Sequence, residues 1–143
     1  MTKAPFLFDS NAIYKLIRET PDRALDKLME GTTINLAYYE LGNALWRECR
    51  LLKRISIEEA EKSLSLMYLM LARMQVAQVN GEKGNEILET ADKFNLTFYD
   101  SAYLVEAKRS SKILVTDDNK LVKAAENIGT ETRSSEEIIN NKH

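Results

Sequence analysis

Short apolar runs alternate along the chain with longer amphipathic segments. Runs typical of buried or half-buried strands occur at residues 5–8, 32–33, 74–79, 112–115 and 130–133. Segments with helical periodicity occur at residues 12–18, 21–28, 34–52, 57–73, 85–94, 101–109 and 119–127. This alternation predicts an α/β fold: a central, twisted, mainly parallel sheet of about four to five strands, with helices on both faces.

Capping residues set several of the expected helix boundaries. A capping box that begins at Ser56 predicts the start of the helix at 57–73. Gly81 and Gly84 indicate a turn before the helix at 85–94, and Asn95 should end that helix because Asn tolerates the left-handed conformation. Ser134 or Ser135 should cap a short final helix.

The segment at residues 64–72 is apolar on almost every side of the predicted helix. Such a helix is either buried on more than one face within the core or in contact with a subunit or partner. Its methionines, Met67 and Met70, would suit an adaptable protein interface. The pattern leaves both interpretations open.

Composition indicates one globular domain over residues 1–143. Hydrophobic residues make up 44% and charged residues 29% of the chain, and the net charge of −2 favours no particular class of partner. No apolar run approaches the roughly 20 residues that a membrane helix needs, and the N-terminus does not resemble a signal peptide. The lone Cys49 excludes an intrachain disulfide, so we expect a cytoplasmic protein without a membrane contact.

The only histidine is the last residue, His143, where we expect a disordered terminus. Catalysis by a positioned histidine and zinc sites built from histidine and cysteine are therefore not expected. If the protein is an enzyme, carboxylates are the side chains that remain for the chemistry.

Aspartates stand where predicted elements begin or end: Asp9, Asp100, Asp117 and Asp118. Ligands of open parallel sheets bind at the carboxyl ends of the strands, so these acids would share one crevice if the first and fourth strands are neighbours. Asp9, Asp100 and Asp118 each stand at a plausible helix start, and for any one of them capping is the more common role.

Glu40 cannot be explained by capping, because it lies in the middle of the predicted helix at 34–52. A cluster of four or five carboxylates without histidine is typical of a site for a hard cation such as Mg²⁺ or Mn²⁺. Without a cation, such a cluster would repel itself and raise its own pKa values.

Four motifs together resemble the PIN domain of VapC-type toxins: FDSNAIYKL, YYELGNALW, FYDSAYLVEA and ILVTDDNKLVKAA. They occur in the order of the family and span about residues 6–128. The resemblance implies a three-layer PIN fold and an endoribonuclease that depends on Mg²⁺ or Mn²⁺ and cleaves RNA with a metal-activated water. It also implies a toxin–antitoxin pair with a VapB-type antitoxin, and a homodimer.

The same resemblance assigns roles to individual residues. It implies four catalytic acids that hold the metal: Asp9, Glu40, Asp100 and Asp118. Asp117 fills the variable position of the Thr-x-Asp pattern and is a supporting candidate ligand. Three polar neighbours would orient the ligands or water: Ser10, Asn43 and Thr116.

Basic residues on the acid-bearing elements are candidates for contact with RNA phosphates: Lys15, Arg18, Arg47 and Arg50. A solvated helix face explains each of them equally well, because lysine and arginine are mostly exposed.

Other functions fit the pattern less well. A haloacid dehalogenase phosphatase needs a second Asp two positions after the first, where this chain has Asn11. A response-regulator receiver needs an acid pair early in the chain. The remaining alternatives are a PIN-like RNA-processing nuclease and a PIN-like scaffold that binds RNA or protein without cleavage.

Overall fold

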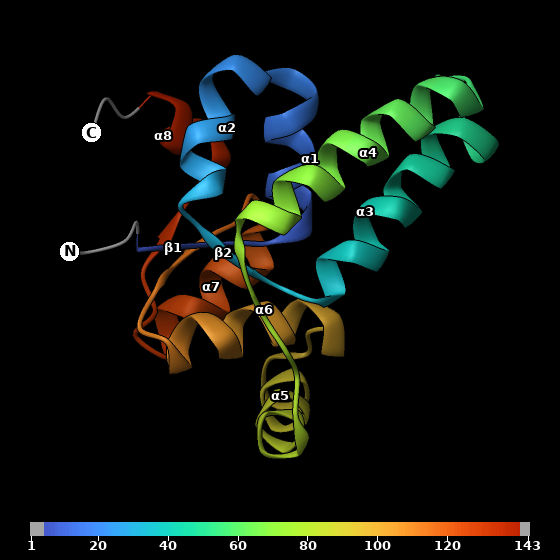
Figure 1. Cartoon of the computed structure of the whole chain (residues 1–143). Helices are drawn as coiled ribbons and strands as arrows, with labels where there is room; N and C mark the ends of the chain where they lie inside the picture. Colours follow the sequence, from blue (N-terminus) through green and yellow to red (C-terminus); the bar gives the residue numbers. More distant parts are fainter. Residues whose placement is uncertain (1–4, 141–143) are drawn as a thin grey trace.

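A computed structural model of the chain describes residues 5–140 (Figure 1). Its five strands are β1 (Phe6–Phe8), β2 (Thr32–Ile34), β3 (Gln75–Ala77), β4 (Ile113–Val115) and β5 (Thr132–Arg133). They form one sheet in the order β3-β2-β1-β4-β5, and every neighbouring pair is parallel. The predicted α/β fold is confirmed, and β1 and β4 are neighbours at the centre of the sheet.

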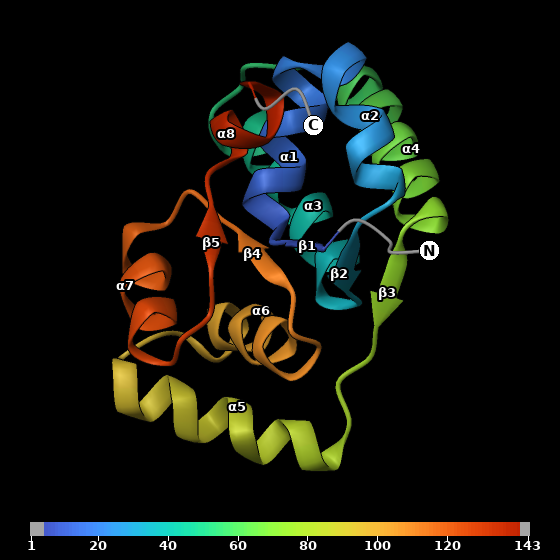
Figure 2. The same ribbon diagram turned by 90° about the vertical axis from the view of Figure 1, so that its left-hand side faces the viewer.

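The helices of residues 5–140 cover both faces of this sheet. They are α1 (Ser10–Glu19), α2 (Pro21–Met29), α3 (Leu36–Trp46), α4 (Ile57–Arg73), α5 (Gly81–Phe94), α6 (Phe98–Arg109), α7 (Asn119–Asn127) and α8 (Ser135–Asn140). A π-helical segment, η1 (Arg47–Leu51), continues α3. Figure 2 shows α1, α2, α3, α4 and α8 on one side of the strands and α5, α6 and α7 on the other.

Alternation along the strands sorts the buried residues into two cores. Phe8 and Val115 belong to the core beneath α1, α2, α3, α4 and α8. Leu7, Leu114 and Ile34 belong to the core beneath α6 and α7. Successive side chains of a strand point to opposite faces, so β1 and β4 each supply both cores. The sheet is thereby buried on both sides, as expected for parallel strands.

The structure corrects several of the predicted boundaries. Gly81 and Gly84 lie inside α5 rather than in a turn before it, because Asn80 caps the helix by accepting a hydrogen bond from Lys83 N (3.1 Å). Ile34 belongs to β2, and the following helix begins at Leu36. Asn95 ends α5 in the left-handed conformation (φ 54°), as predicted.

Helix α4 buries its methionines in the core. Met67 is fully buried and Met70 nearly so, beside the partly buried Leu64. Tyr68, whose ring packs against Tyr38 of α3, is partly exposed, and Leu69 is more so. Met67 and Met70 are therefore core residues. Of these α4 side chains, only Tyr68 and Leu69 remain available for contact with another protein. Figure 1 shows α3 and α4 side by side, extending away from the sheet.

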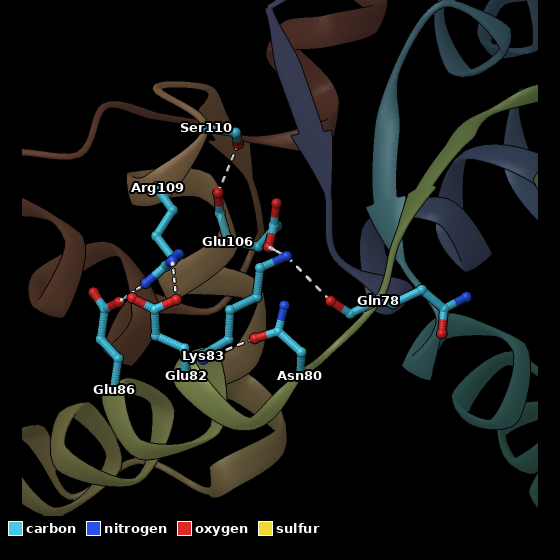
Figure 3. A network of polar contacts seen from close by, with 8 residues as sticks. All are labelled: Gln78, Asn80, Glu82, Lys83, Glu86, Glu106, Arg109 and Ser110. Atoms are coloured by element: carbon cyan, nitrogen blue, oxygen red, sulfur yellow. Dashed lines mark hydrogen bonds and ion pairs between the residues drawn. The ribbon is translucent and has the colours of Figure 1, made fainter.

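Helix α5 is joined to α6 by ion pairs (Figure 3). Lys83 Nζ lies 2.8 Å from Glu106 Oε1, and Arg109 Nη1 lies 2.7 Å from Glu86 Oε1. The Lys83–Glu106 pair is mostly shielded from solvent, and Lys83 also donates to the carbonyl oxygen of Gln78 (3.1 Å). These contacts hold α5 along the outer side of α6.

Among residues 5–140, no helix combines the length and the apolar character required to cross a membrane. His143 lies outside the described residues.

Candidate active site

Asp9 lies at the carboxyl end of β1, where the strand passes into α1. Its backbone N–H donates to Val115 of β4 (3.1 Å), and its Oδ1 accepts a hydrogen bond from Ala12 N at the start of α1 (2.8 Å). The residue is only 4% exposed. Asp9 is thus both a helix cap and a buried carboxylate held between two central strands.

Burial raises the pKa of Asp9 to about 7. This value already includes the hydrogen bonds from the Thr116 hydroxyl and the Ala12 N–H, which lower the pKa, and the charges of Asp117 and Asp100, which raise it. A carboxylate with this pKa lies in an environment that disfavours its negative charge. A nearby cation would therefore stabilise the charged form of Asp9.

Glu40 projects from the middle of α3 and is held by two hydroxyl groups. Its Oε1 accepts hydrogen bonds from Ser10 Oγ and from Tyr103 Oη, each at 2.8 Å. Ser10 and Tyr103 are buried, and burial together with the charge of Glu40 raises the pKa of Tyr103. The phenol therefore remains a protonated donor, and one oxygen of Glu40 is fixed in place. Among the described residues, the other oxygen has no donor.

Asp100 lies in the first turn of α6 and is half-buried. The helix begins at Phe98, earlier than the predicted 101–109, because Thr97 is the N-cap and accepts from Asp100 N (3.0 Å). Burial raises the pKa of the Asp100 carboxyl, and the charge of Asp118 raises it further. Capping is thus supplied by Thr97, and the Asp100 side chain is available for another role.

The two aspartates after β4 have different surroundings. Asp118 caps α7, with its Oδ1 accepting from Lys120 N (2.8 Å) and Leu121 N (3.3 Å). Asp117 accepts at Oδ1 from Ser135 N (2.9 Å) and at Oδ2 from Ser135 Oγ (2.7 Å). Both oxygens of Asp117 are therefore engaged at the start of α8, whereas Asp118 stands close enough to Asp100 to affect its pKa.

Three of the four predicted acids line one pocket of about 340 Å³: Asp9, Glu40 and Asp100. Ser10 and Asn43 line it as well, as does Arg47. Thr116 does not line the pocket, but its hydroxyl forms a hydrogen bond with Asp9. Asp118 does not line it either, but its charge is close enough to raise the pKa of Asp100.

Of the four basic candidates, only Arg47 is brought to the pocket wall. Arg18 donates to Ser63 Oγ of α4 (2.7 Å), and its guanidinium lies 5.9 Å from the centre of the Tyr14 ring. Lys15 and Arg50 are exposed and do not line the pocket.

Two tyrosines of the pocket had no role in the sequence-based prediction. Tyr103 follows Asp100 by about one helical turn, so helical spacing alone could have placed both on one face. Tyr14 follows Ser10 by four residues, also about one turn, and its buried hydroxyl has no hydrogen-bond partner within residues 5–140. A buried hydroxyl in a pocket wall is suited to a bound phosphate oxygen or water.

The donor set fits a hard divalent cation held partly through water. Oxygen ligands such as carboxylates are the ones that Mg²⁺ prefers, and burial raises the pKa values of Asp9 and Asp100, so a bound cation would favour their charged forms. Within the described part of the chain, no three acidic, cysteine or histidine side chains are placed to hold one ion together. Mg²⁺ is usually bound by one or two carboxylates and keeps several waters, so the arrangement remains compatible with it.

Comparisons with known proteins identify the family of the chain. A family model of the PIN domain matches residues 6–127. Exonuclease VapC9 from Pyrobaculum aerophilum is 31% identical over 117 residues, covering 82% of this chain and 83% of that protein. Ribonuclease VapC3 from the same organism is 30% identical over 105 residues, covering 72% and 77%. The crystal structure of PAE2754 from P. aerophilum superposes with a TM-score of 0.78 at 29% identity, covering 96% of both chains. The chain belongs to the PIN domain family, among its VapC-type members.

Proposed function

We propose that this protein is the toxin of a toxin–antitoxin pair, an endoribonuclease that requires Mg²⁺ or Mn²⁺. The observation that carries the proposal is the meeting of Asp9, Glu40 and Asp100 in one pocket, although they come from three separate elements. The relatives named Exonuclease VapC9 and Ribonuclease VapC3 support a nuclease.

The three acids of the pocket, Asp9, Glu40 and Asp100, would hold the metal together with the neighbouring Asp118. A bound divalent ion would supply an activated water and neutralise charge on the scissile phosphate. Ser10 and Tyr103 keep the Glu40 carboxylate in one orientation, so that its second oxygen is presented to the pocket. Thr116 holds Asp9 in the same way. Such supporting contacts fix the direction of the metal ligands.

Substrate contact would come from the remaining pocket residues. Arg47 at the pocket wall offers a positive charge to a phosphate, and the unpartnered hydroxyl of Tyr14 offers a donor. Asn43 lies on the same wall as Glu40 and can orient water or a nucleotide. We assign no phosphate contact to Arg18, because its guanidinium is engaged with Ser63.

The proposed partners are a VapB-type antitoxin and a second copy of this chain in a homodimer, and the proposed location is the cytoplasm. Support comes from the VapC names of the relatives. The arm formed by α3 and α4 also exposes Leu69 (57%) and Tyr68 (37%), apolar side chains that a partner could cover.

The decisive experiment measures cleavage of a labelled single-stranded RNA by the purified protein. We expect cleavage with Mg²⁺ or Mn²⁺ and none after addition of EDTA. Asp9→Asn and Asp100→Asn should each abolish cleavage, because each removes a proposed metal ligand. Asp92→Asn, on the exposed side of α5, is the matched control and should keep full activity. Metal-dependent cleavage that survives in both pocket variants would refute the mechanism.

A circular RNA separates the two modes of cleavage. An endonuclease opens the circle, whereas an exonuclease needs a free end and leaves it intact. We expect opening of the circle. Growth arrest on expression of the wild type, but not of Asp9→Asn, together with its relief by the product of a neighbouring short gene, would test the toxin–antitoxin assignment.

A further inference from the structure

Two tyrosines stand beside the acids of the pocket and are largely exposed. Tyr39 directly precedes Glu40 on α3, and Tyr99 directly precedes Asp100 on α6. Tyr39 is 78% exposed and Tyr99 is 57% exposed. Neighbouring residues of a helix point about 100° apart, so each tyrosine lies on the flank of the acid that follows it.

Both tyrosines line a second hollow of about 690 Å³. Its walls also include Leu36, Glu40 and Asn43. Glu40 and Asn43 line the acid pocket as well, so the two hollows share a wall. A chain-like ligand bound at the acids would therefore continue past Tyr39 and Tyr99.

The fold itself makes little use of these two rings. Tyr38, the neighbour of Tyr39, packs edge-on against Tyr68 with the ring centres 4.9 Å apart. Within residues 5–140, neither Tyr39 nor Tyr99 belongs to an aromatic pair or a cation–π contact. Aromatic side chains usually bury much of their surface, so two exposed rings at one hollow indicate a site for a flat ligand.

We propose that this hollow holds an unpaired base of the RNA substrate, adjacent to the scissile phosphate, stacked on Tyr39 and Tyr99. The inference rests on the proposed ribonuclease function and specifies its substrate as single-stranded RNA. Stacking on aromatic side chains is the usual way in which unpaired bases are held. The amide of Asn43 at the shared wall can hydrogen-bond the edge of the base.

The charge of the hollow selects a base rather than a phosphate. Its described lining includes the carboxylate of Glu40 and no lysine or arginine, whereas the acid pocket has Arg47. A phosphate would be repelled by Glu40, but an uncharged aromatic ring would not. The phosphate therefore belongs in the acid pocket and the neighbouring base in the hollow.

Binding is tested in an Asp9→Asn background, so that the labelled single-stranded RNA is not cut during fluorescence anisotropy. We expect Tyr39→Ala and Tyr99→Ala each to weaken binding roughly 5- to 100-fold, the range for loss of one base-stacking contact. Tyr39→Phe and Tyr99→Phe keep the ring and should bind like the parent. Trp46→Ala, an exposed aromatic residue of α3 outside the hollow, is the matched control.

A substrate lacking a base at one position makes the test specific. An abasic nucleotide next to the cleavage point should weaken binding to the parent protein, and the effects of Tyr39→Ala and Tyr99→Ala should then disappear. In the active protein, the same substitutions should raise KM and leave kcat nearly unchanged. Duplex RNA, whose bases are already stacked, should bind equally to parent and variants.

The outcomes also separate this inference from the proposed function. If the wild type neither binds nor cuts single-stranded RNA, the function itself fails. If it cuts RNA and the tyrosine-to-alanine variants keep the same KM, only the base site is refuted. Unchanged RNA binding with an altered association state on light scattering would make the hollow a protein contact and would also overturn the proposal.

Discussion

Tyr103 Oη donates a hydrogen bond to Glu40 Oε1 at 2.8 Å, although the two residues are 63 positions apart in the chain. Ser10 Oγ donates to the same oxygen at the same distance. Three elements thus converge on a single carboxylate oxygen. The direction of the Glu40 side chain therefore depends on how α3 packs against α1 and α6.

Replacing Tyr103 with phenylalanine should lower metal affinity or cleavage roughly 10- to 100-fold, as is typical when a group that orients a metal ligand is lost. The ring and its packing remain, so the fold should survive. The measurement is a Mg²⁺ titration of the cleavage rate. Tyr68→Phe is the control, because that hydroxyl donates to the Tyr38 carbonyl, away from the pocket. A wild-type Mg²⁺ dependence in Tyr103→Phe would contradict a positioning role.

Asp9 should make the metal-free protein less stable at neutral pH. Its pKa is about 7 in the folded protein and 3.8 in the reference state, so the folded form binds this proton more tightly. The favourable contribution of protonated Asp9 to the free energy of unfolding is therefore largest below about pH 4. It declines as the pH rises toward 7 and is lost above about pH 7. Because Asp9 is only 4% exposed, the change approaches about 4 kcal/mol.

Asp9→Asn should therefore stabilise the EDTA-treated protein at pH 8 while abolishing cleavage. Asparagine can still accept the Ala12 N–H, so the helix cap is retained. Thermal unfolding at pH 5.5 and pH 8 measures the effect, and added Mg²⁺ should raise the melting temperature of the wild type more at pH 8 than at pH 5.5. A wild type as stable at pH 8 as the Asn variant, both without metal, would contradict the burial of an unneutralised charge.

Substitutions of Asp117 and Asp118 should have different consequences. Asp117→Ala removes both contacts to Ser135 and should destabilise the protein by about 1–3 kcal/mol with little loss of cleavage in the folded fraction. Asp118→Ala removes a helix cap worth about 0.5–2 kcal/mol and should also lower cleavage strongly. Urea unfolding and cleavage rates of both variants decide which aspartate belongs to the site; a larger loss of cleavage in Asp117→Ala would reverse the assignment.

Gly31 should tolerate no side chain. A Cβ atom there would lie 2.5 Å from Cε2 of Phe8, so Gly31→Ala must displace a buried ring beside Asp9. We expect destabilisation of about 1–3 kcal/mol in urea unfolding. Gly84→Ala is the matched control: its Cβ would meet nothing within 4 Å, and the position lies within α5. That variant should be stabilised by about 0.5–1 kcal/mol, and equal effects of the two substitutions would contradict the clash.

The sequence was most informative where local chemistry decides the structure. The apolar run before Asp9 and the capping box at Ser56 placed β1 and α4, because both signals act within a few residues. It was misleading at Gly81 and Gly84, whose weak helix propensity was outweighed by the Asn80 cap and by burial of Ile87. The helix propensity of one residue contributes less free energy than packing does. The conformation of such a glycine therefore cannot be predicted from its neighbours in the sequence.

The sequence pointed to the acids that meet in the pocket and to two of the residues that contact them, Ser10 and Thr116, but not to Tyr103. Asp9, Glu40 and Asp100 could be expected to converge from their places at or near strand ends and from the motif pattern. The contact of Tyr103 with Glu40 depends on how α3 and α6 lie in space, which no spacing within either helix reveals. The engagement of Asp117 by Ser135 likewise depends on where α8 returns to the sheet.

The place of β1 at the centre of the sheet has a consequence for the protein during its synthesis. Its register pairs Phe6 with Ile113, so the strand leaves the ribosome long before one of its two neighbours has been translated. Asp100 and Tyr103 also emerge late, and any product that stops before them lacks the pocket. The pocket is therefore completed only late in synthesis, after the elements that carry Asp9 and Glu40 have been made.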